Sequence, residues 1–328
     1  MVKQNWLITG GCGFLGCSLF AQLRDQGQNV RMVDNLSVGR LEDLPLAESP
    51  QAVALQDMGS WDALTVVQAD ICDADVALKV CEGADIIVHL AANTGVMPSI
   101  ENPRLDCETN VNGVLNYLEG ARTHGVKRFV LASSSAPVGE QEPPIHEEMP
   151  AHPMSPYGAS KLAGEGYCSA YWHSFGVETI ALRFGNVFGP GSVHKGSVVA
   201  LFIRRALANE NLIIYGTGQQ TRDFIYINDL RDAIVAAATK PGLNGGEVIQ
   251  IATGRERTVG EVAEALSELL LQKTGKAPTI VHEGERVGEM LRNYSDTSKA
   301  RRLLGYDPQM AFADGLEQTL DYFLAKQD

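Results

Sequence analysis

Residues 6–26 combine a strand, a glycine loop and a helix in one uninterrupted stretch. Trp6–Thr9 is a short apolar strand that runs straight into the loop, and helical spacing follows from residue 18 to residue 26. Gly10, Gly13 and Gly16 permit a tight turn, a close approach of the backbone to a pyrophosphate and close packing of the helix on the strand. The N-terminus of the helix offers free amides to phosphates. This order of elements is typical of the first unit of a parallel sheet that binds a dinucleotide.

A second predicted strand indicates which dinucleotide is favoured. It covers residues 29–33 and ends in Asp34. A carboxylate at this point can accept hydrogen bonds from the ribose hydroxyls of adenosine, and it repels a 2'-phosphate, so the sequence favours NAD over NADP. Arg40 keeps the alternative open, because a nearby arginine can accommodate the additional phosphate.

Further apolar runs recur at the spacing of an alternating fold. The predicted strands cover residues 64–69, 85–90, 128–131 and 178–182, and helical patterns cover residues 105–125 and 157–175. Near-continuous apolar runs suit a parallel sheet that is buried on both faces. The predicted fold class is therefore α/β, a Rossmann-type doubly wound parallel sheet with a smaller mixed α/β substrate-binding domain. His89, inside one of these strands, reads as a packed strand-end histidine.

Composition narrows the possible partners and the compartment. The 328 residues carry a formal net charge of −13, which disfavours a nucleic-acid partner. No apolar run approaches the ~18 residues of a membrane span, and the N-terminus lacks the apolar stretch of a signal peptide. The six cysteines are scattered, without the close pairs that zinc sites use, and read as reduced thiols. We expect a cytoplasmic protein with no metal, no nucleic acid and no membrane partner.

The stretch Ser155–Lys161 carries the candidate chemistry. Ser155 is a good N-cap and Pro156 suits the first helical position, so Tyr157 should lie in the first turn of a helix. Lys161 follows four residues later, on the same helix face. A nearby cation favours the ionised form of a phenol, so this pair predicts a tyrosine of lowered pKa that can remove a proton from an alcohol. Taken by itself, the motif has an alternative interpretation: the spacing arises by chance, and Tyr157 is a buried aromatic residue beside a lysine.

Several motifs in order extend this pattern over nearly the whole chain. They are Thr9–Gly16, Asp34, Asp70–Ile71, His89–Ala92, Thr109–Asn110, Ser133–Ser135 and Ser155–Lys161. Together they resemble the extended short-chain dehydrogenase/reductases, in particular the NAD-dependent nucleotide-sugar epimerases and dehydratases of the UDP-glucose 4-epimerase type. The resemblance implies an enzyme that binds NAD and a UDP-sugar.

The resemblance assigns catalytic roles to Ser134, Tyr157 and Lys161. Tyr157 is the base, Lys161 holds the phenolate and the nicotinamide ribose, and Ser134, five residues before Gly139, bonds the reacting oxygen. Ser133 or Ser135 could take the place of Ser134, so this choice stays open. The implied cofactor contacts are Gly10, Gly13, Phe14, Leu15, Gly16, Asp34, Asn35, Ser37, Gly39, Arg40, Asp70, Ile71, Leu90, Ala91, Ala92, Asn110, Ser133, Tyr157, Lys161, Phe184 and Val187. Asn110 is also expected to brace the helices of the site.

The second half of the chain is expected to bind the sugar nucleotide. Arg222 and Arg286 resemble the arginines that pair with the substrate diphosphate, which suits the bidentate fork of a guanidinium. Surface ion pairs with Asp223 and Glu289 are the alternative reading of these two arginines. The implied substrate contacts are Ser134, Tyr157, Asn186, Val198, Val199, Tyr215, Arg222, Arg286, Glu289 and Asn293.

The residues after Ser134 favour one reaction within the family. Dehydratases of this type carry an Asp-Glu pair just beyond the active-site hydroxyl, and decarboxylases place a glutamate there, whereas this chain has Ser135-Ala136-Pro137-Val138. We therefore expect a 4-epimerase that forms a 4-keto intermediate and returns the hydride to the opposite face. A dehydratase, decarboxylase or reductase of the same family is the alternative. A non-catalytic NAD-binding regulator is the alternative from another class, and the retained Ser134, Tyr157 and Lys161 argue against it.

The identity of the sugar stays open between UDP-glucose or galactose, UDP-N-acetylglucosamine and UDP-glucuronate. Val138 and Gly185 are smaller than their counterparts in many relatives, which predicts additional space near the sugar. Asn293 occupies the position of a gate residue, where a small side chain admits an N-acetyl group. His194 and Lys195 could meet a uronic carboxylate or lie in a solvated loop.

Domain division and association also follow from the resemblance. Residues 1–180 plus about 224–252 are expected to form the NAD-binding domain, and about 181–223 plus 253–328 the nucleotide-sugar domain. A homodimer is expected, formed when residues 105–125 and 157–175 of two subunits pack as a four-helix bundle.

Overall fold

The sequence folds around one eight-stranded sheet. The computed structural model describes residues 2–46, 50–284 and 291–326. In the spatial order β12-β7-β6-β5-β1-β2-β4-β3, the strands are Glu247–Ile251, Thr179–Phe184, Arg128–Ser134, Ile86–His89, Asn5–Thr9, Asn29–Asp34, Thr65–Gln68 and Ala52–Val53. Each neighbouring pair is parallel, which confirms the predicted doubly wound α/β sheet.

The order of the strands reverses beside β1. From β1 the chain proceeds outward through β2 and β4, and it then returns to the other side of β1 with β5 and continues through β6 and β7. Ligands of open α/β sheets bind beyond the carboxyl ends of the strands at such a reversal. The glycine loop after β1 and the end of β6 at Ser134 both lie at this edge.

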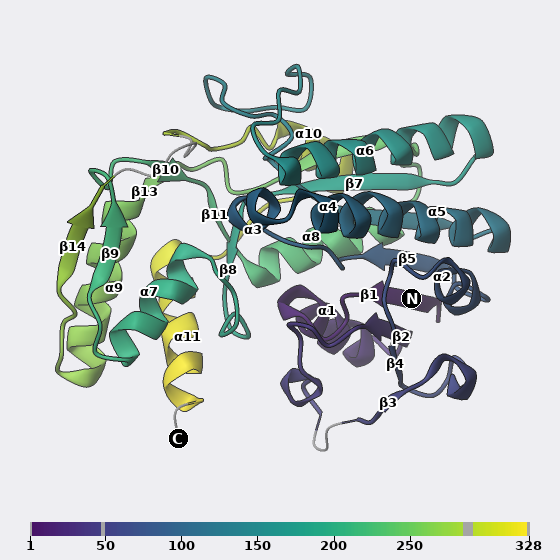
Figure 1. Ribbon diagram of the computed structural model, residues 1–328, viewed down its shortest axis with the longest axis horizontal. Coiled ribbons are helices and arrows are strands. Elements are labelled where there is room, and N and C mark those ends of the chain that lie inside the picture. Colours follow the sequence, from purple (N-terminus) through teal and green to yellow (C-terminus); the bar gives the residue numbers. More distant parts are fainter. Residues whose placement is uncertain (1, 47–49, 285–290, 327–328) are drawn as a thin grey trace.

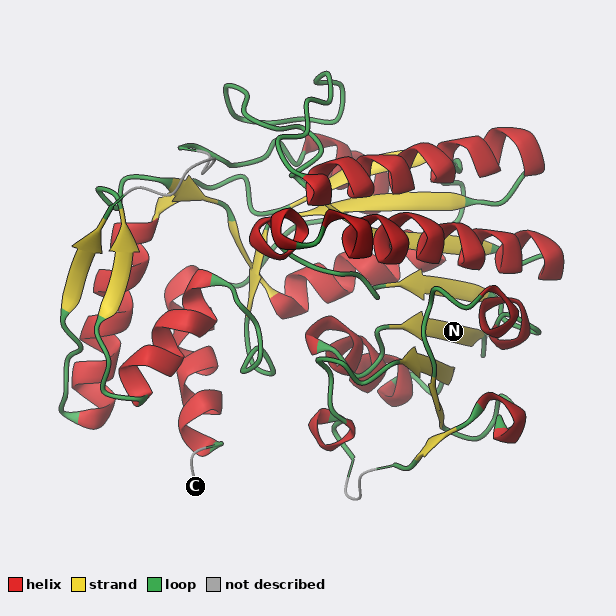
Figure 2. Ribbon diagram, viewed as in Figure 1, coloured by secondary structure: helices red, strands yellow, loops and turns green. Residues whose placement is uncertain are grey.

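Helices cover both faces of the sheet, as Figures 1 and 2 show. Trp6 and Ile8 of β1 belong to the core on the face of α1 (Phe14–Asp25) and α8 (Ile227–Thr239). Leu7 belongs to the second core, together with side chains of α2 (Ala74–Val80), α5 (Gly113–His124) and α6 (Pro156–Phe175). Burial on both faces explains why these strands lack the alternating polar pattern of a half-exposed sheet.

A smaller unit lies beside the carboxyl edge of the sheet (Figure 1). It contains the parallel pair β9 (Leu212–Tyr215) and β14 (Ile280–Glu283), and the antiparallel pair β10 (Thr221–Arg222) and β13 (Arg257–Thr258). Its helices are α7 (Val198–Leu207), α9 (Val259–Thr274) and α11 (Phe312–Ala325). The pair β8 (Asn186–Phe188) and β11 (Phe224–Tyr226) runs between this unit and the sheet.

Local signals explain several boundaries. Helix α9 begins at a capping box, in which Thr258 accepts a hydrogen bond from the Glu261 amide and the Glu261 side chain accepts one from the Thr258 amide. Helix α10 (Ser298–Leu304) ends at Gly305 in the left-handed conformation. No helix in the described part of the chain is long and apolar enough to cross a membrane.

The predicted helix over residues 105–125 is interrupted. It consists of α4 (Pro103–Cys107), a π-helical turn (Glu108–Asn112) and α5, which follow one another directly after α3 (Val96–Glu101). Hydrophobic spacing does not reveal such a turn, because the additional residue per turn changes the helical phase only locally. The turn carries Asn110, which lies buried within it.

Candidate active site

The first turn of α6 brings Tyr157 to the end of β6. The Ser155 hydroxyl accepts a hydrogen bond from the Gly158 amide at 3.1 Å, and Pro156 occupies the first helical position, as predicted. A side chain on Gly158 would lie 2.7 Å from the Ala136 carbonyl oxygen. The glycine therefore lets the helix approach the segment that follows β6.

The three serines at the end of β6 have three different partners. The Ser133 hydroxyl donates to Glu165 Oε1 at 2.6 Å, and the Asn293 amide donates to Ser135 Oγ at 3.4 Å. The Ser134 hydroxyl accepts from the Ala136 amide at 3.2 Å, and it is the serine that lies near enough to the Tyr157 phenol to lower its pKa. This proximity supports the choice of Ser134 as the partner of a reacting oxygen.

The prediction that Tyr157 has a lowered pKa is wrong for the protein alone. Burial raises the pKa of the Tyr157 phenol to about 12, and the Asp106 carboxylate adds to the increase, while the hydrogen bond with Ser134 only partly opposes it. Lys161 Nζ lies 5.8 Å from the centre of the Tyr157 ring and donates to the Ala132 carbonyl at 2.9 Å. Spacing along the helix did not show that the phenol would lose so much of its hydration.

Lys161 itself is a buried cation. Burial lowers the pKa of its ammonium to about 8, and the carboxylates of Asp106 and Glu165 oppose this shift. An ammonium whose pKa lies this close to neutral pH can release or accept a proton there. The pair of Tyr157 and Lys161 is therefore suited to moving protons once a further positive charge stabilises the phenolate.

Asn110 connects three segments around this pair. Its side-chain amide donates to the Asn93 carbonyl at 2.9 Å, to Asp106 Oδ1 at 3.0 Å and to Ser160 Oγ at 3.2 Å, and its oxygen accepts from the Asn93 amide. The π-helical turn thereby joins the loop after β5 to α4 and α6. These contacts agree with the expected bracing role of Asn110.

His89 is packed inside the sheet, as expected. Nδ1 of its ring lies 3.1 Å from Thr9 Oγ1, and the ring stacks near Tyr117 and Phe129. Burial lowers its pKa to about 3, so the ring stays neutral. A neutral, fully enclosed ring does not offer an accessible acid or base.

The glycine loop and Asp34 form a cradle that fits a dinucleotide. A side chain on Gly16 would lie 2.3 Å from the Gly10 carbonyl oxygen, and one on Gly39 would lie 2.5 Å from the Cys12 carbonyl group. The Asp34 carboxylate accepts hydrogen bonds from the Cys12 and Leu36 amides at 2.9 and 2.8 Å. The first turn of α1 contains no acidic residue, so its amides can meet a pyrophosphate. These residues fit NAD.

The other predicted cofactor residues surround this cradle. Arg40, Asn35 and Ser37 are exposed on the loop after β2, and Phe14 and Leu15 begin α1. Of the remaining positions, Phe184 is the last residue of β7, Val187 lies in β8, and the others follow strand ends: Asp70, Ile71, Leu90, Ala91 and Ala92. All of them lie along the carboxyl edge of the sheet or next to it.

Four predicted substrate residues line one small pocket. Asn186, Val198, Tyr215 and Arg222 surround a cavity of about 120 Å³ between α7, β9 and β10. Sequence patterns did not identify the other lining residues, namely Gly196, Leu201, Phe202, Ile213, Ile214, Gln220 and Val259. Most of these belong to apolar helical or strand patterns that look like ordinary core.

The neighbour of Arg222 does not act as its surface counter-ion. Asp223 is buried, and its carboxylate accepts hydrogen bonds from the Thr253 amide and hydroxyl and from the Gly254 amide. Burial raises the pKa of Asp223, against these hydrogen bonds. The carboxylate therefore serves to join β11 to the end of β12.

Three expectations about the sugar site need correction or limitation. A side chain on Gly185 would lie 2.9 Å from the Asp223 carbonyl oxygen, so the glycine permits close backbone packing and opens no space. Val138 is fully buried, and the Val199 side chain packs in the core, so neither faces a cavity. Arg286 and Glu289 lie outside the described residues. Asn293 is buried beside Ser135, the residue that follows Ser134.

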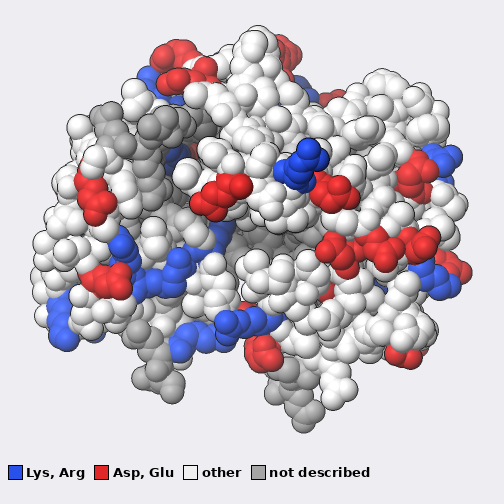
Figure 3. Space-filling view, in the orientation of Figure 1, with Lys and Arg blue, Asp and Glu red and all other residues white. Residues whose placement is uncertain are grey.

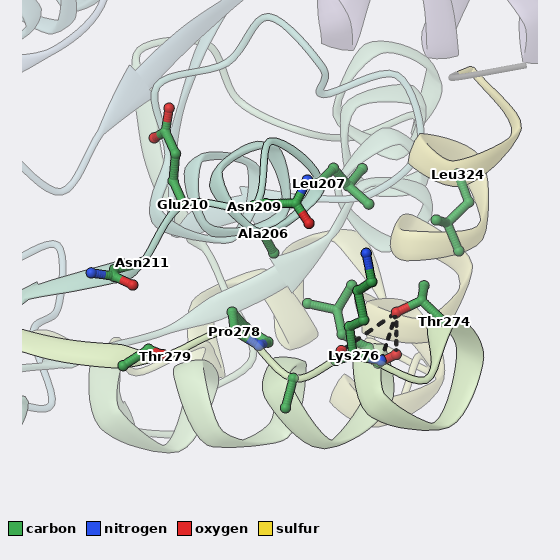
Figure 4. A pocket seen from close by; sticks show the side chains of 12 residues that line it. Ala206, Leu207, Asn209, Glu210, Asn211, Thr274, Lys276, Pro278, Thr279 and Leu324 are labelled. Carbon is green, nitrogen blue, oxygen red and sulfur yellow. Dashed lines mark hydrogen bonds between the residues drawn. The ribbon is translucent and has the colours of Figure 1, made fainter.

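A larger hollow is remote from this chemistry. It measures about 560 Å³ and lies beside the ends of α7, α9 and α11, where Figure 4 shows Asn209, Thr274, Lys276 and Leu324 around it. Neither the glycine loop nor α6 contributes to its lining.

In the view of Figure 3, basic side chains gather over the smaller unit and toward the centre, and acidic ones over the sheet-covering helices. The overall negative charge thus does not prevent a locally positive site.

Two carboxylates beside Lys161 were not predicted. Asp106 precedes Asn110 by four residues, and Glu165 follows Lys161 by four. Each carboxylate therefore lies on the same helix face as a residue that the motifs had identified. Both are almost completely buried, at 1% and 4% exposure. The four-residue spacing could have identified both residues as part of the site, because a carboxylate on a buried helix face is rare unless it has a partner.

Known proteins resemble this chain over its full length. Residues 6–252 match the model of the NAD dependent epimerase/dehydratase family. UDP-glucose 4-epimerase of Mycolicibacterium smegmatis is 34% identical over 325 residues, covering 98% of each chain. dTDP-glucose 4,6-dehydratase of Streptomyces niveus is 32% identical, covering 97% of this chain and 92% of that protein. The structure of Thermus thermophilus UDP-glucose 4-epimerase in complex with NAD matches with a TM-score of 0.84 at 31% identity, covering 97% and 98% of the two chains.

Proposed function

Because this chain belongs to the NAD-dependent epimerase/dehydratase family, we propose that it is a UDP-sugar 4-epimerase that acts by transient oxidation at carbon four of the sugar. The observation that carries the proposal is the convergence of Ser134 and Tyr157 at a site where the following segment offers no acid. That segment, residues 135–138, contains one serine and three apolar residues.

Each side chain has a role that follows from its position. Tyr157 Oη removes the proton of the sugar hydroxyl, and Ser134 Oγ, which lies near Tyr157, orients the same oxygen. Lys161 stabilises the phenolate by its charge. The chemistry that NAD supplies when bound is reversible hydride transfer. Gly10, Gly16 and Asp34 hold its pyrophosphate and adenosine ribose.

The carboxylates near the site support epimerisation over dehydration. Elimination of water requires an acid and a base that reach the sugar. Glu165 is buried, and its oxygens accept hydrogen bonds from Ser133 and Arg183. Asp106 is buried too, with Oδ1 bonded to the Asn110 amide and no hydrogen-bond partner at Oδ2 within the described residues. Neither carboxylate belongs to the segment after Ser134, so return of the hydride is the fate of the keto intermediate that the site supports best.

The choice among sugars rests on Asn293 and on the neighbouring residues His194 and Lys195. Asn293 contacts Ser135, and its small side chain at the position that resembles the gate residue supports an N-acetyl sugar. Lys195 donates to the Val187 carbonyl at 3.2 Å and lies 5.1 Å from the Phe14 ring centre, so it remains a candidate for a uronic carboxylate. His194 lies 3.7 Å from Asp43, which would repel such a carboxylate. UDP-glucose, UDP-N-acetylglucosamine and UDP-glucuronate are therefore the substrates to compare.

An incubation without added cofactor tests the proposal. The purified protein, loaded with NAD and then freed of excess nucleotide, is mixed separately with the three UDP-sugars. We expect one or more to equilibrate with its 4-epimer, which chromatography resolves. Product that forms only with added NADPH would overturn the epimerase assignment in favour of a reductase, and a 4-keto-6-deoxy product would indicate a dehydratase. Tyr157→Phe is the matched inactive control.

We also propose the domain division and the association. The NAD-binding domain comprises residues 1–180 plus about 224–252, and β12 supports this because it pairs with β7 in the large sheet.

A homodimer through residues 105–125 and 157–175 is supported by exposed apolar side chains at Leu105, Tyr167 and Phe175. Sedimentation at micromolar concentration should show a dimer, and a monomer alone would contradict it. A cytoplasmic location agrees with six free cysteines.

A further inference from the structure

Three successive residues of β6 contact three residues of α6 that are spaced one helical turn apart. The Ala132 carbonyl accepts from Lys161 Nζ at 2.9 Å, and the Ser133 hydroxyl donates to Glu165 at 2.6 Å. The third of these strand residues, Ser134, lies near Tyr157, and its hydroxyl lowers the pKa of the phenol. Since residues four apart lie on one face of a helix, a single face of α6 is matched to the end of the strand.

Glu165 extends this match to the next strand. Its carboxylate accepts from Arg183 Nε at 2.8 Å and from Arg183 Nη2 at 2.7 Å, a two-point contact that fixes direction as well as distance. Arg183 lies on β7 directly opposite Ser133 in the sheet register. Glu165 thereby holds α6 against β6 and β7 at the level of the catalytic hydroxyls.

This ion pair is enclosed. The Glu165 and Arg183 side chains are 4% and 5% exposed. Replacing a buried ion pair by well-packed apolar side chains often leaves stability unchanged or increases it, so stability alone explains such a pair poorly. A geometric role explains it better, because the Ser134 and Tyr157 hydroxyls come from different elements and must meet within hydrogen-bond distance.

We propose that Glu165 is a positioning residue that sets α6 against the end of β6 and so aligns Ser134 with Tyr157 for the reaction. It does not touch the substrate. It acts through Ser133, the neighbour of Ser134, and through Lys161, one turn earlier on the helix. This inference rests on the proposed function for its kinetic consequence, but the geometry can be measured without any turnover.

Ser133→Ala is the mildest test, because it removes one contact of Glu165 and leaves the ion pair intact. We expect kcat to fall about tenfold with KM changed less than about twofold, since alignment affects the reacting atoms more than binding of the nucleotide. Glu165→Gln removes the charge and one of the Arg183 contacts, and we expect kcat to fall about 100-fold. Glu165→Asp should recover part of this loss, since it keeps the charge.

A control for the loss of an ion pair comes from the opposite end of the same strands. Arg128 of β6 donates from Nε and Nη2 to one oxygen of Glu178, Oε2, at 3.2 and 2.8 Å, and this glutamate is 44% exposed. Glu178→Gln should lower the thermal midpoint without changing kcat. If Glu165→Gln does not fold, Ser133→Ala against this control still decides the question.

Crystal structures of the variants separate this inference from the assignment of activity. We expect the Ser134 and Tyr157 hydroxyls of Ser133→Ala to lie further apart than in the unaltered protein in part of the molecules. If this distance is unchanged and kcat is within twofold of the unaltered protein, the positioning role is wrong. If the unaltered protein turns over none of the UDP-sugars while the distance increases in the variants, the proposed function fails and the positioning role stands.

Discussion

Tyr157 should resist ionisation in nucleotide-free protein. Its pKa of about 12 lies two units above the ordinary value of 10.0, which corresponds to about 3 kcal/mol against the phenolate. At pH 8 only about one molecule in 10⁴ would carry the phenolate. The site therefore needs an additional positive charge before the tyrosine can act as a base, and oxidised nicotinamide carries one.

The phenolate band in the near-ultraviolet measures this directly. The chain has nine tyrosines, so the titration of Tyr157→Phe is subtracted from that of the unaltered protein. In nucleotide-free protein the difference should be small up to pH 11, and saturation with NAD should move its onset at least two units lower. Ser134→Ala should shift the titration upward, because the Ser134 hydrogen bond lowers the pKa of Tyr157. An onset at or below pH 10 without nucleotide would refute the burial argument.

Three further substitutions test the cofactor cradle, the substrate pocket and the buried histidine. Arg222→Leu should weaken UDP binding at least tenfold in calorimetry while NAD binding is unchanged, since the arginine lines the pocket proposed for the substrate, away from the glycine loop. Gly39→Ala should weaken NAD binding, because its Cβ would lie 2.5 Å from the glycine loop, whereas Gly166→Ala, with open space around it, should not. His89 has a pKa of about 3 against 6.5, so the unfolded chain binds a proton that the native ring refuses, and stability falls as pH drops below 6.5. Denaturant titrations should show about 2 kcal/mol of this loss by pH 5, and His89→Phe should lack it.

Much of the fold could be predicted from local chemistry. The glycine loop, the Ser155 cap and the Thr258 capping box each act within a few residues, so sequence spacing specifies them. Strand β12 was not identified as a strand, because its partner β7 lies more than sixty residues earlier and its own stretch is short.

The sequence predicted that Tyr157 and Lys161 lie together, but it did not predict the direction of the pKa shift of the phenol. Helical spacing placed Tyr157 and Lys161 on one face, yet it contains no information about how much water reaches the phenol. The same limit applies to Gly185, whose missing side chain is filled by the backbone of Asp223 from a distant segment. Properties that depend on what packs against a residue require the tertiary structure.

The Asp34 carboxylate is tied to the amides of both Cys12 and Leu36. The carboxylate proposed to bind the adenosine ribose thus also supports the loop that is proposed to hold the pyrophosphate. Engineering this enzyme to accept the phosphorylated coenzyme would consequently require more than exchanging one side chain. A neutral or basic substitute would have to be accompanied by a new support for the turn, or both coenzymes would be lost together.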